Sequence, residues 1–495
     1  MPPSKLARSS HKLTVRALLP AFAQMGGFGE EESARMLRRM VESTPHREHH
    51  SIEASGFNQW LLDLVLLRRW LRTSWAPDTQ PVVVVPSLIT QVQLLSALLR
   101  ERAAAGRPRP HTIDAPWLRE LVATDMAPTW SVTESGSQGP YWWPIYKALQ
   151  KRSLHETYWR SVREEYHASG RGVDEAWIVT AFPFANHEDL YLATLLDQPA
   201  SFVSRVIIGS LEGGMVRMKG PAARALSSMP AHRPILIALP YPTALTARSW
   251  FGGDARSRRP ISVLFQGRTR NFKGQDAVRR AIVNTFRNNS RSVQRHFGVS
   301  GQQSRGHLGR LSTLALCKES GGQGGSVATS RFDLAERSDF CLEPAGDTPT
   351  RSHFYLAVLS GCIPVIFDQT RVSAQRSLWG PWGSVPDGET AATRDVEPRT
   401  AWAWRDRGLN YSNFAVILNA DAVADGRVNV WLELARMATH DKGRIAALRR
   451  GLDRAAEWMH FLGGDTASSD AFSRFQRVVA ARSFATNREG AKGRL

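Results

Sequence analysis

The stretch that most constrains the fold of this chain is residues 338–368, whose pattern predicts a single strand–helix–strand unit. Residues 340–342 are apolar and suit a short buried strand, which the following proline- and glycine-containing segment ends. Thr348 is placed to cap a helix, and apolar residues then recur at helical spacing as far as Gly361. Residues 362–367 are apolar and largely β-branched, as in a parallel strand that is covered on both faces.

The polar turn inside this unit predicts a ligand site. Ligands of open α/β sheets bind outside the carboxyl ends of the strands, close to helix N-termini. Free backbone N–H groups, a helix dipole and the guanidinium of Arg351 together suit a diphosphate there. The alternative for Arg351 is a surface pair with Asp347. Three more residues would shape the pocket, or serve only in turn and capping chemistry: Gly346, Thr348 and Thr350.

The same residues resemble those of a known family. The run FCLEPAGDTPTR followed by GCIPVIF resembles the signature of the exostosin-like glycosyltransferases (glycosyltransferase family 47), closest in look to plant and algal members. Weaker similarities are PVVVVP near residue 82, SGRGVDEAWIV near 169, LFQGRTR near 264 and NYSNFAVIL near 410. The resemblance therefore spans most of residues 80–460, with its specific part in 338–368.

The order of predicted elements agrees with the fold that this resemblance implies. Strands are expected at 81–86, 176–182, 205–209, 234–239 and 261–267, and helices at 88–105, 149–168, 275–288 and 430–462. Alternating strands and helices favour parallel, doubly wound sheets. The resemblance implies a GT-B-like α/β fold, in which two Rossmann-like domains face a cleft.

A Pro-, Gly- and Arg-rich segment at 240–260 interrupts the alternation and predicts an interdomain linker. The expected organisation is a disordered basic segment at 1–60, an acceptor-side domain at 61–245, a donor-side domain at 246–480 and a basic tail at 481–495.

The charge is strongly basic. There are 64 Lys and Arg against 45 Asp and Glu, a formal net charge of +19. This indicates either a generally basic surface or an anionic partner such as a nucleotide sugar, acidic glycan, membrane or nucleic acid. The scattered distribution favours the first, with local clusters at 256–259, 268–273 and 449–454.

Three cysteines are too few for a disulfide-dense scaffold, and they lack metal-ligand spacing. Cys341 and Cys362 lie on predicted strands, where core packing is the expected role. The resemblance leaves open a bridge between Cys317 and Cys341 in a lumenal domain.

The resemblance also implies Golgi localisation, where family members usually carry an N-terminal signal anchor. The first 60 residues contain no apolar run near the ~20 residues that a membrane helix needs. The segment WLLDLVLLRRWL from Trp60 contains three charged residues and predicts an amphipathic surface helix.

Further donor contacts are expected from two places. Gly267 and Arg270 follow the predicted strand 261–267 and would hold the diphosphate from the opposite side, although a basic surface loop is the alternative. Glu343 and Asp347 are candidates for the ribose hydroxyls of the donor. Glu343 could equally be a satisfied charge at the end of a strand.

An inverting transferase needs a base that takes the proton of the acceptor hydroxyl. The layout places this base on the first domain, with Asp174, His187 and Glu188 as the candidates. Asp174 matches the aspartate of the family's G-R-D-H segment, whereas Glu175 stands where the family has histidine. The alternative for His187 and Glu188 is the start of the next helix.

The resulting hypothesis is an inverting glycosyltransferase that moves a sugar from a UDP-linked donor to a glycan hydroxyl. No DxD motif lies in residues 338–368, so no metal and no other cofactor are expected. The alternative is a non-catalytic protein on a degenerate transferase scaffold, which would bind glycans, polyanions or nucleic acid.

Overall fold

The computed structural model describes, in whole or in part, residues 30–43, 62–72, 82–106, 151–168, 176–182, 188–211, 234–241, 259–266, 276–285, 312–316, 335–344, 352–368, 411–461 and 470–479. These residues form two compact units, each built on its own parallel sheet. The first unit contains the described residues up to 241 together with 470–479, and the second contains those from 259 to 461. The α/β class with parallel sheets is thereby confirmed.

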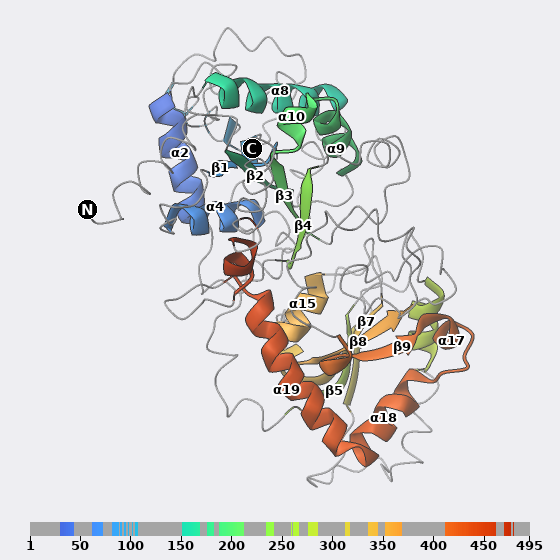
Figure 1. Cartoon of the computed structure of the whole chain (residues 1–495). Helices are drawn as coiled ribbons and strands as arrows, with labels where there is room; N and C mark the ends of the chain where they lie inside the picture. Colours follow the sequence, from blue (N-terminus) through green and yellow to red (C-terminus); the bar gives the residue numbers. More distant parts are fainter. Residues whose placement is uncertain are drawn as a thin grey trace, which may run out of the picture. The chain divides into compact units, whose positions relative to one another are not determined.

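The sheet of the first unit has its strands in sequence order, β1-β2-β3-β4, all parallel (Figure 1). They are β1 (Val82–Val85), β2 (Trp177–Phe182), β3 (Val206–Leu211) and β4 (Ile235–Leu239). Most of their described side chains are buried. A parallel strand that is buried on both faces needs apolar residues at nearly every position, and the sequences of these strands are nearly continuous apolar runs.

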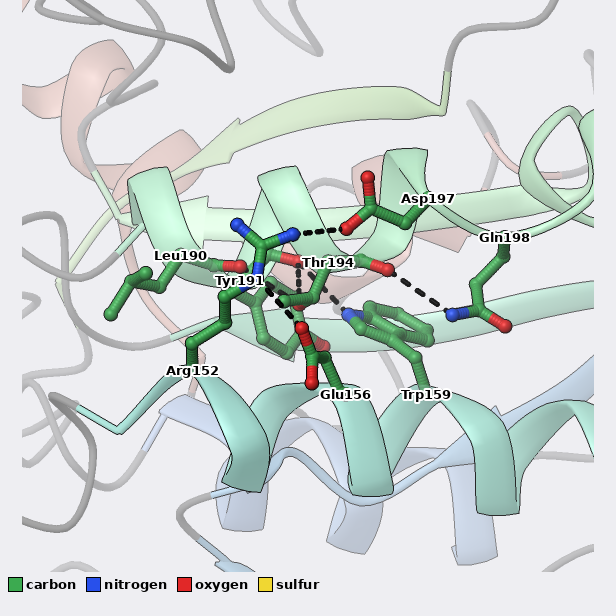
Figure 2. Close-up of polar contacts among 8 residues, drawn as sticks. All are labelled: Arg152, Glu156, Trp159, Leu190, Tyr191, Thr194, Asp197 and Gln198. Atoms are coloured by element: carbon green, nitrogen blue, oxygen red, sulfur yellow. Dashed lines mark hydrogen bonds and ion pairs between the residues drawn. The ribbon is translucent and has the colours of Figure 1, made fainter.

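Helices α8 (Arg152–Ala168) and α9 (Glu188–Leu196) pack together along a polar seam. Figure 2 shows Trp159 of α8 donating from its indole nitrogen to the carbonyl of Tyr191 over 2.9 Å. At the same seam Arg152 bonds Glu156 at 2.7 Å and Asp197 at 2.6 Å. The short helix α10 (Ala200–Val203) follows and leads into β3. The hydrogen bond from Trp159 to Tyr191 thus gives the buried indole N–H of α8 a partner, as a large buried aromatic side chain with a polar group requires.

Two N-terminal helices correct the sequence analysis. Helix α2 (Glu30–Ser43) lies within the segment expected to be disordered, and it packs on α4 (Leu62–Arg72). Its residues Met36, Leu37 and Val41 are buried, which gives the helix an apolar face that the basic composition concealed. Helix α4 was expected to be amphipathic, and its residues Leu62, Leu64, Leu66, Leu67 and Trp70 are buried while Arg68 and Arg69 are partly exposed. What the expectation missed is that Asp63 is buried as well.

A buried carboxylate of α4 fixes the chain just after β1. Asp63 is 2% exposed and accepts the backbone N–H of Ser87 at 2.8 Å. Ser87 in turn accepts the backbone N–H of Thr90, as an N-cap residue does. Burial raises the pKa of Asp63 from 3.8 to about 6, against the opposing effect of its hydrogen bonds.

This raised pKa predicts how the stability of the first unit depends on pH. The folded state holds the Asp63 proton more tightly than the unfolded chain, so ionisation of this group destabilises the fold. Between pH 4.5 and 6 the free energy of unfolding should therefore fall by about 1.5 kcal/mol because of Asp63. Asp63→Asn keeps an acceptor for Ser87 and should flatten this fall, measured by urea denaturation across the pH range. The same fall in the variant would contradict the assignment.

Residues 470–479 also differ from the expected domain limits, which placed them with the second domain. Asp470 is fully buried and pairs with Arg69 of α4 at 2.9 Å. Phe472 and Phe475 contact Trp70 edge to face. These contacts place the described part of this segment in the first unit.

The second unit has the strand order β6-β5-β7-β8-β9, again all parallel. Figure 1 labels four of these strands, β5, β7, β8 and β9. The strands are β5 (Ile261–Gln266), β6 (Ser312–Leu316), β7 (Ser338–Glu343), β8 (Ile363–Asp368) and β9 (Val416–Asn419). The chain adds β6 on one side of β5, and then β7, β8 and β9 in succession on the other. Strand β6 was missed in the sequence, where it lies between two glycine-rich stretches.

Helices cover both faces of this sheet. One face buries Val263, Phe340 and Val365 against a helix at 276–285, α17 (Ala420–Ala424) and α18 (Val430–His440). The alternate residue Leu264 lies on the other face with Ala357 of α15 (Ser352–Leu359). The segment expected as one helix at 430–462 is two, since Asp441 ends α18 and caps α19 (Lys442–Met459).

A disulfide joins Cys341 of β7 to Cys362, which precedes β8. Both residues are fully buried, beside Leu264 and Ala357. Because the chain has only one other cysteine, this bond excludes the bridge between Cys317 and Cys341. The expectation that Cys341 and Cys362 serve only in core packing was therefore incomplete, since they also form a covalent bond. The physical reason is that β7 and β8 are parallel neighbours, which brings the two residues to a Cα–Cα distance of 5.8 Å.

Arg259 connects the amino end of β7 to the residue that follows the carboxyl end of α15. Its guanidinium donates to the carbonyl of Ser338 at 2.6 Å and to that of Ser360 at 3.0 Å. Gly361 ends α15 with φ +74, and a Cβ there would lie 2.7 Å from an Arg259 nitrogen. Glycine is therefore needed both for its backbone conformation and for the closeness of the guanidinium.

Gly361→Ala should accordingly destabilise the chain by about 1.5–3.5 kcal/mol, of which about 1–2 come from the left-handed backbone and the rest from the displaced Arg259 hydrogen bond. Gly426→Ala is the matched control, since Gly426 has the same φ of +74 but no atom within 4 Å of the added Cβ. The comparison uses the free energy of unfolding in urea. Equal losses in the two variants would show that the Arg259 contact contributes nothing.

Candidate functional site

The carboxyl edge of the second sheet contains the point at which strand order reverses. β5 lies between β6 and β7, so the connection after β5 runs to one side and the later strands lie on the other. Their pairing register places Phe265 beside Leu342, and the two strands then end at Gln266 and Glu343. In doubly wound sheets of this order, the crevice outside such neighbouring strand ends is where ligands bind.

Both predicted diphosphate loops leave the sheet at this point. Gly267 and Arg270 follow β5, and the turn with Arg351 follows β7. These residues lie outside the described part of the structure, as do the remaining turn residues Gly346, Asp347, Thr348 and Thr350. The structure shows that the two loops begin on adjacent strands, which sequence spacing alone could not establish.

Glu343, the last residue of β7, is the predicted site residue whose side chain the structure describes. It is 0% exposed, and its Oε1 lies 2.5 Å from Nδ1 of His353. His353 is in the first turn of α15 and is 5% exposed. This contact occupies one carboxylate oxygen of Glu343, as the strand-end alternative expects, and the contact of Glu343 with the ribose stays a prediction.

This pair connects the two ends of the turn. Glu343 precedes the turn and His353 follows it, so their contact fixes the separation between the end of β7 and the start of α15. Sequence reasoning missed His353. Its only signal was a polar residue at the start of an otherwise apolar helix.

A buried arginine supports the start of the same turn. Arg279, in the helix at 276–285, is 3% exposed and donates to the carbonyl of Pro344 at 3.2 Å. Arg279 could not be singled out in the sequence either, because nothing in its neighbourhood distinguishes it from a surface arginine. Arg279, Glu343 and His353 together hold both ends of the candidate ligand loop with buried polar contacts.

The candidate bases belong to the first unit. Asp174 and His187 lie outside the described residues, on either side of β2, and Glu188 begins α9 with a side chain that is likewise not described. The beginning of α9 agrees with the helix-start alternative for Glu188. The roles of all three remain predictions.

Within the part of the chain that the structure describes, no cluster of three or more His, Cys, Asp or Glu side chains is arranged to hold a metal ion. None of the helices described is both long enough and apolar enough to cross a membrane.

Comparison with known proteins supports the resemblance. Residues 227–427 match the family model described as the Exostosin GT47 domain. The chain is 51% identical to the Arabidopsis thaliana protein "Xyloglucan-specific galacturonosyltransferase 1" over 39 residues. This matched segment is 8% of this chain and 6% of the relative. The chain is 54% identical to "Probable xyloglucan galactosyltransferase GT20" of the same plant over 36 residues, and this segment is 7% of this chain and 6% of the relative.

These matches cover only a small part of the relatives' lengths. No solved structure matches the chain. The similarity to exostosin-like glycosyltransferases of family 47 is thus confirmed over the region that contains the strand–helix–strand unit.

Proposed function

Because residues 227–427 match the exostosin GT47 domain, we propose that the chain is a glycosyltransferase that moves a sugar from a nucleotide-sugar donor to a glycan hydroxyl. The observation that carries this proposal is the adjacency of β5 and β7 at the reversal point of the second sheet. The names of the plant relatives mention xyloglucan, a polysaccharide, and this supports a polysaccharide acceptor.

The donor would bind at the carboxyl edge of the second sheet. Arg270, from the loop after β5, and Arg351, from the turn after β7, would neutralise the diphosphate from two sides. Gly267, Gly346, Thr348 and Thr350 would bring backbone and hydroxyl groups close to it. Asp347 keeps its predicted contact with the ribose, and a UDP-linked sugar is the proposed donor.

The proposed reaction inverts the anomeric carbon of the sugar. The acceptor oxygen attacks that carbon while the bond to the diphosphate oxygen breaks, and UDP leaves with its electron pair. A base on the first unit, drawn from Asp174, His187 and Glu188, takes the acceptor proton. This scheme corresponds to a GT-B arrangement, with the donor on the second unit and the base on the first.

We expect the leaving diphosphate to be stabilised by arginines and by the start of α15, without a metal ion. Donor turnover should therefore continue in excess EDTA. The buried disulfide supports a Golgi-lumenal location, since such bonds persist in oxidising compartments.

Within this proposal, Glu343 is a positioning residue that acts through His353. Glu343→Gln keeps the shape of the side chain but replaces a charge-assisted hydrogen bond by a neutral one, at a cost of about 1–2 kcal/mol. We expect kcat/KM for the donor to fall roughly 5- to 30-fold, because the turn that holds the diphosphate loses its anchor.

A double-mutant cycle with His353→Gln separates this role from general destabilisation. The two substitutions should be strongly non-additive in kcat/KM, since each removes the same contact. Additive losses, or unchanged kinetics in folded Glu343→Gln, would refute the positioning role.

The proposed function as a whole is tested by a thermal-shift screen against UDP, GDP and their sugars. A nucleotide present at 100 times its Kd adds about 2.7 kcal/mol of stability to the folded state. We expect UDP or a UDP-sugar to stabilise the protein. If none of the nucleotides raises the unfolding temperature, the alternative of a non-catalytic polyanion-binding protein gains support, since the net charge is +19.

A further inference from the structure

A second basic site lies between α19 and η8 (Tyr411–Asn413), in a pocket of about 250 Å³. Gly451 permits the close approach of these elements, since a Cβ there would lie only 1.9 Å from the carbonyl oxygen of Asn413. The residues that line the pocket are Ser412, Asn413, Arg444, Ala447, Leu448, Arg450 and Arg454. The described part of the lining is therefore basic and polar, and it includes no carboxylate.

The three arginines of the pocket differ from their neighbour Arg449. Arg449 pairs with Asp339 of β7, whereas Arg444, Arg450 and Arg454 are exposed and form no ion pair with any residue that the structure describes. Arg450 and Arg454 are also four residues apart on one helix, where like charges repel. A bound anion would relieve this repulsion.

The pocket is separate from the proposed donor edge. η8 precedes β9, and Asp339 lies near the beginning of β7, so this part of α19 faces the amino ends of the strands. The donor loops leave from the carboxyl ends at Gln266 and Glu343. The two sites therefore lie at opposite edges of the same sheet.

The geometry favours an extended anion. Arg444 and Arg454 are separated by roughly 15 Å along the helix axis, at a rise of 1.5 Å per residue. A single phosphate cannot bridge that length, whereas a chain with repeated negative charges can. Ser412 and Asn413 supply hydroxyl and amide groups that suit sugar hydroxyls. None of the described residues that line the pocket is aromatic, which disfavours the stacking of nucleic acid bases.

We propose that the pocket of Arg444, Arg450 and Arg454 binds an acidic glycan, a sugar chain that carries carboxylate or sulfate groups. This inference rests on the proposed function, in that the glycan would be an acceptor or product held away from the reaction centre. Binding there would keep a growing polysaccharide attached to the enzyme between transfers.

The test is direct binding to the full-length protein, measured by isothermal titration calorimetry. The probes are oligogalacturonate, which carries carboxylates, a heparin oligosaccharide, which carries sulfates, a neutral xyloglucan oligosaccharide and a single-stranded oligonucleotide. The variant replaces Arg444, Arg450 and Arg454 by glutamine. The control replaces three other exposed arginines by glutamine, namely Arg38, Arg160 and Arg280.

We expect at least one acidic oligosaccharide to bind the wild type, and the pocket variant to lose about tenfold or more in affinity while the control stays close to wild type. Equal affinities in the two variants, no binding of either acidic probe, or pocket-dependent binding of the oligonucleotide alone would overturn the proposal. Donor hydrolysis without acceptor is measured on the same proteins. It should be unchanged in the pocket variant. A wild type that neither hydrolyses a donor nor transfers its sugar to any of the oligosaccharide probes would refute the proposed function, while leaving the glycan-binding result to stand separately.

Discussion

Replacing Cys341 and Cys362 together by alanine should lower the free energy of unfolding by about 3 kcal/mol. The bond closes a loop with a sequence separation of 21 residues, and its loss restores the conformational entropy of that loop in the unfolded chain. Both residues are fully buried, so the truncation also removes packing contacts beside Leu264 and Ala357. Urea denaturation followed by circular dichroism measures the change.

Cys317→Ala is the matched control, because Cys317 has no cysteine left to pair with. It should change the stability by no more than about 0.5 kcal/mol. A double variant as stable as the wild type would show that the bond contributes nothing to the fold. Since the closed loop contains the candidate diphosphate turn, the double variant should also bind the donor more weakly.

Arg351→Ala should weaken the binding of UDP or a UDP-sugar by roughly 1.5–3 kcal/mol, the scale of a hydrogen bond to a charged group. This corresponds to about a 10- to 150-fold rise in Kd, which calorimetry resolves. Arg351→Lys should recover only part of the loss, because lysine cannot form the bidentate contact of a guanidinium.

Arg337→Ala serves as the control, since Arg337 is an exposed arginine just before the amino end of β7. It should leave nucleotide affinity unchanged. If folded Arg351→Ala binds UDP as tightly as the wild type does, Arg351 is not a diphosphate ligand. The proposed role of the turn after β7 would then have to pass to other residues.

The strand–helix–strand unit at 338–368 was predictable because its local signals agree with one another. Apolar runs, turn residues and a helix-ending glycine all lead to the same structure, and β7, α15 and β8 are observed there. Helix α2 was missed because its charged residues outnumber the few apolar side chains that it buries. Composition describes such a helix poorly, since burial depends on the periodicity of a handful of residues.

The polar contacts at the site were not predictable, because they depend on tertiary structure. The pairing of Glu343 with His353 requires the length of the turn and the direction of α15, and the contact of Arg279 with Pro344 joins residues 65 apart in the chain. The disulfide was within reach of the sequence, since Cys341 and Cys362 lie at the two strands of one βαβ unit. Parallel strands joined by a single helix are usually neighbours in the sheet.

The measurement that tests the central claim most directly is the release of free UDP from a panel of UDP-sugars, with and without glycan acceptors, in the presence of EDTA. The account predicts that the wild type releases UDP from at least one donor and does so faster with an acceptor, and that Arg351→Ala loses most of this activity. Absence of release from every donor by folded wild-type protein that still binds acidic oligosaccharides would contradict it.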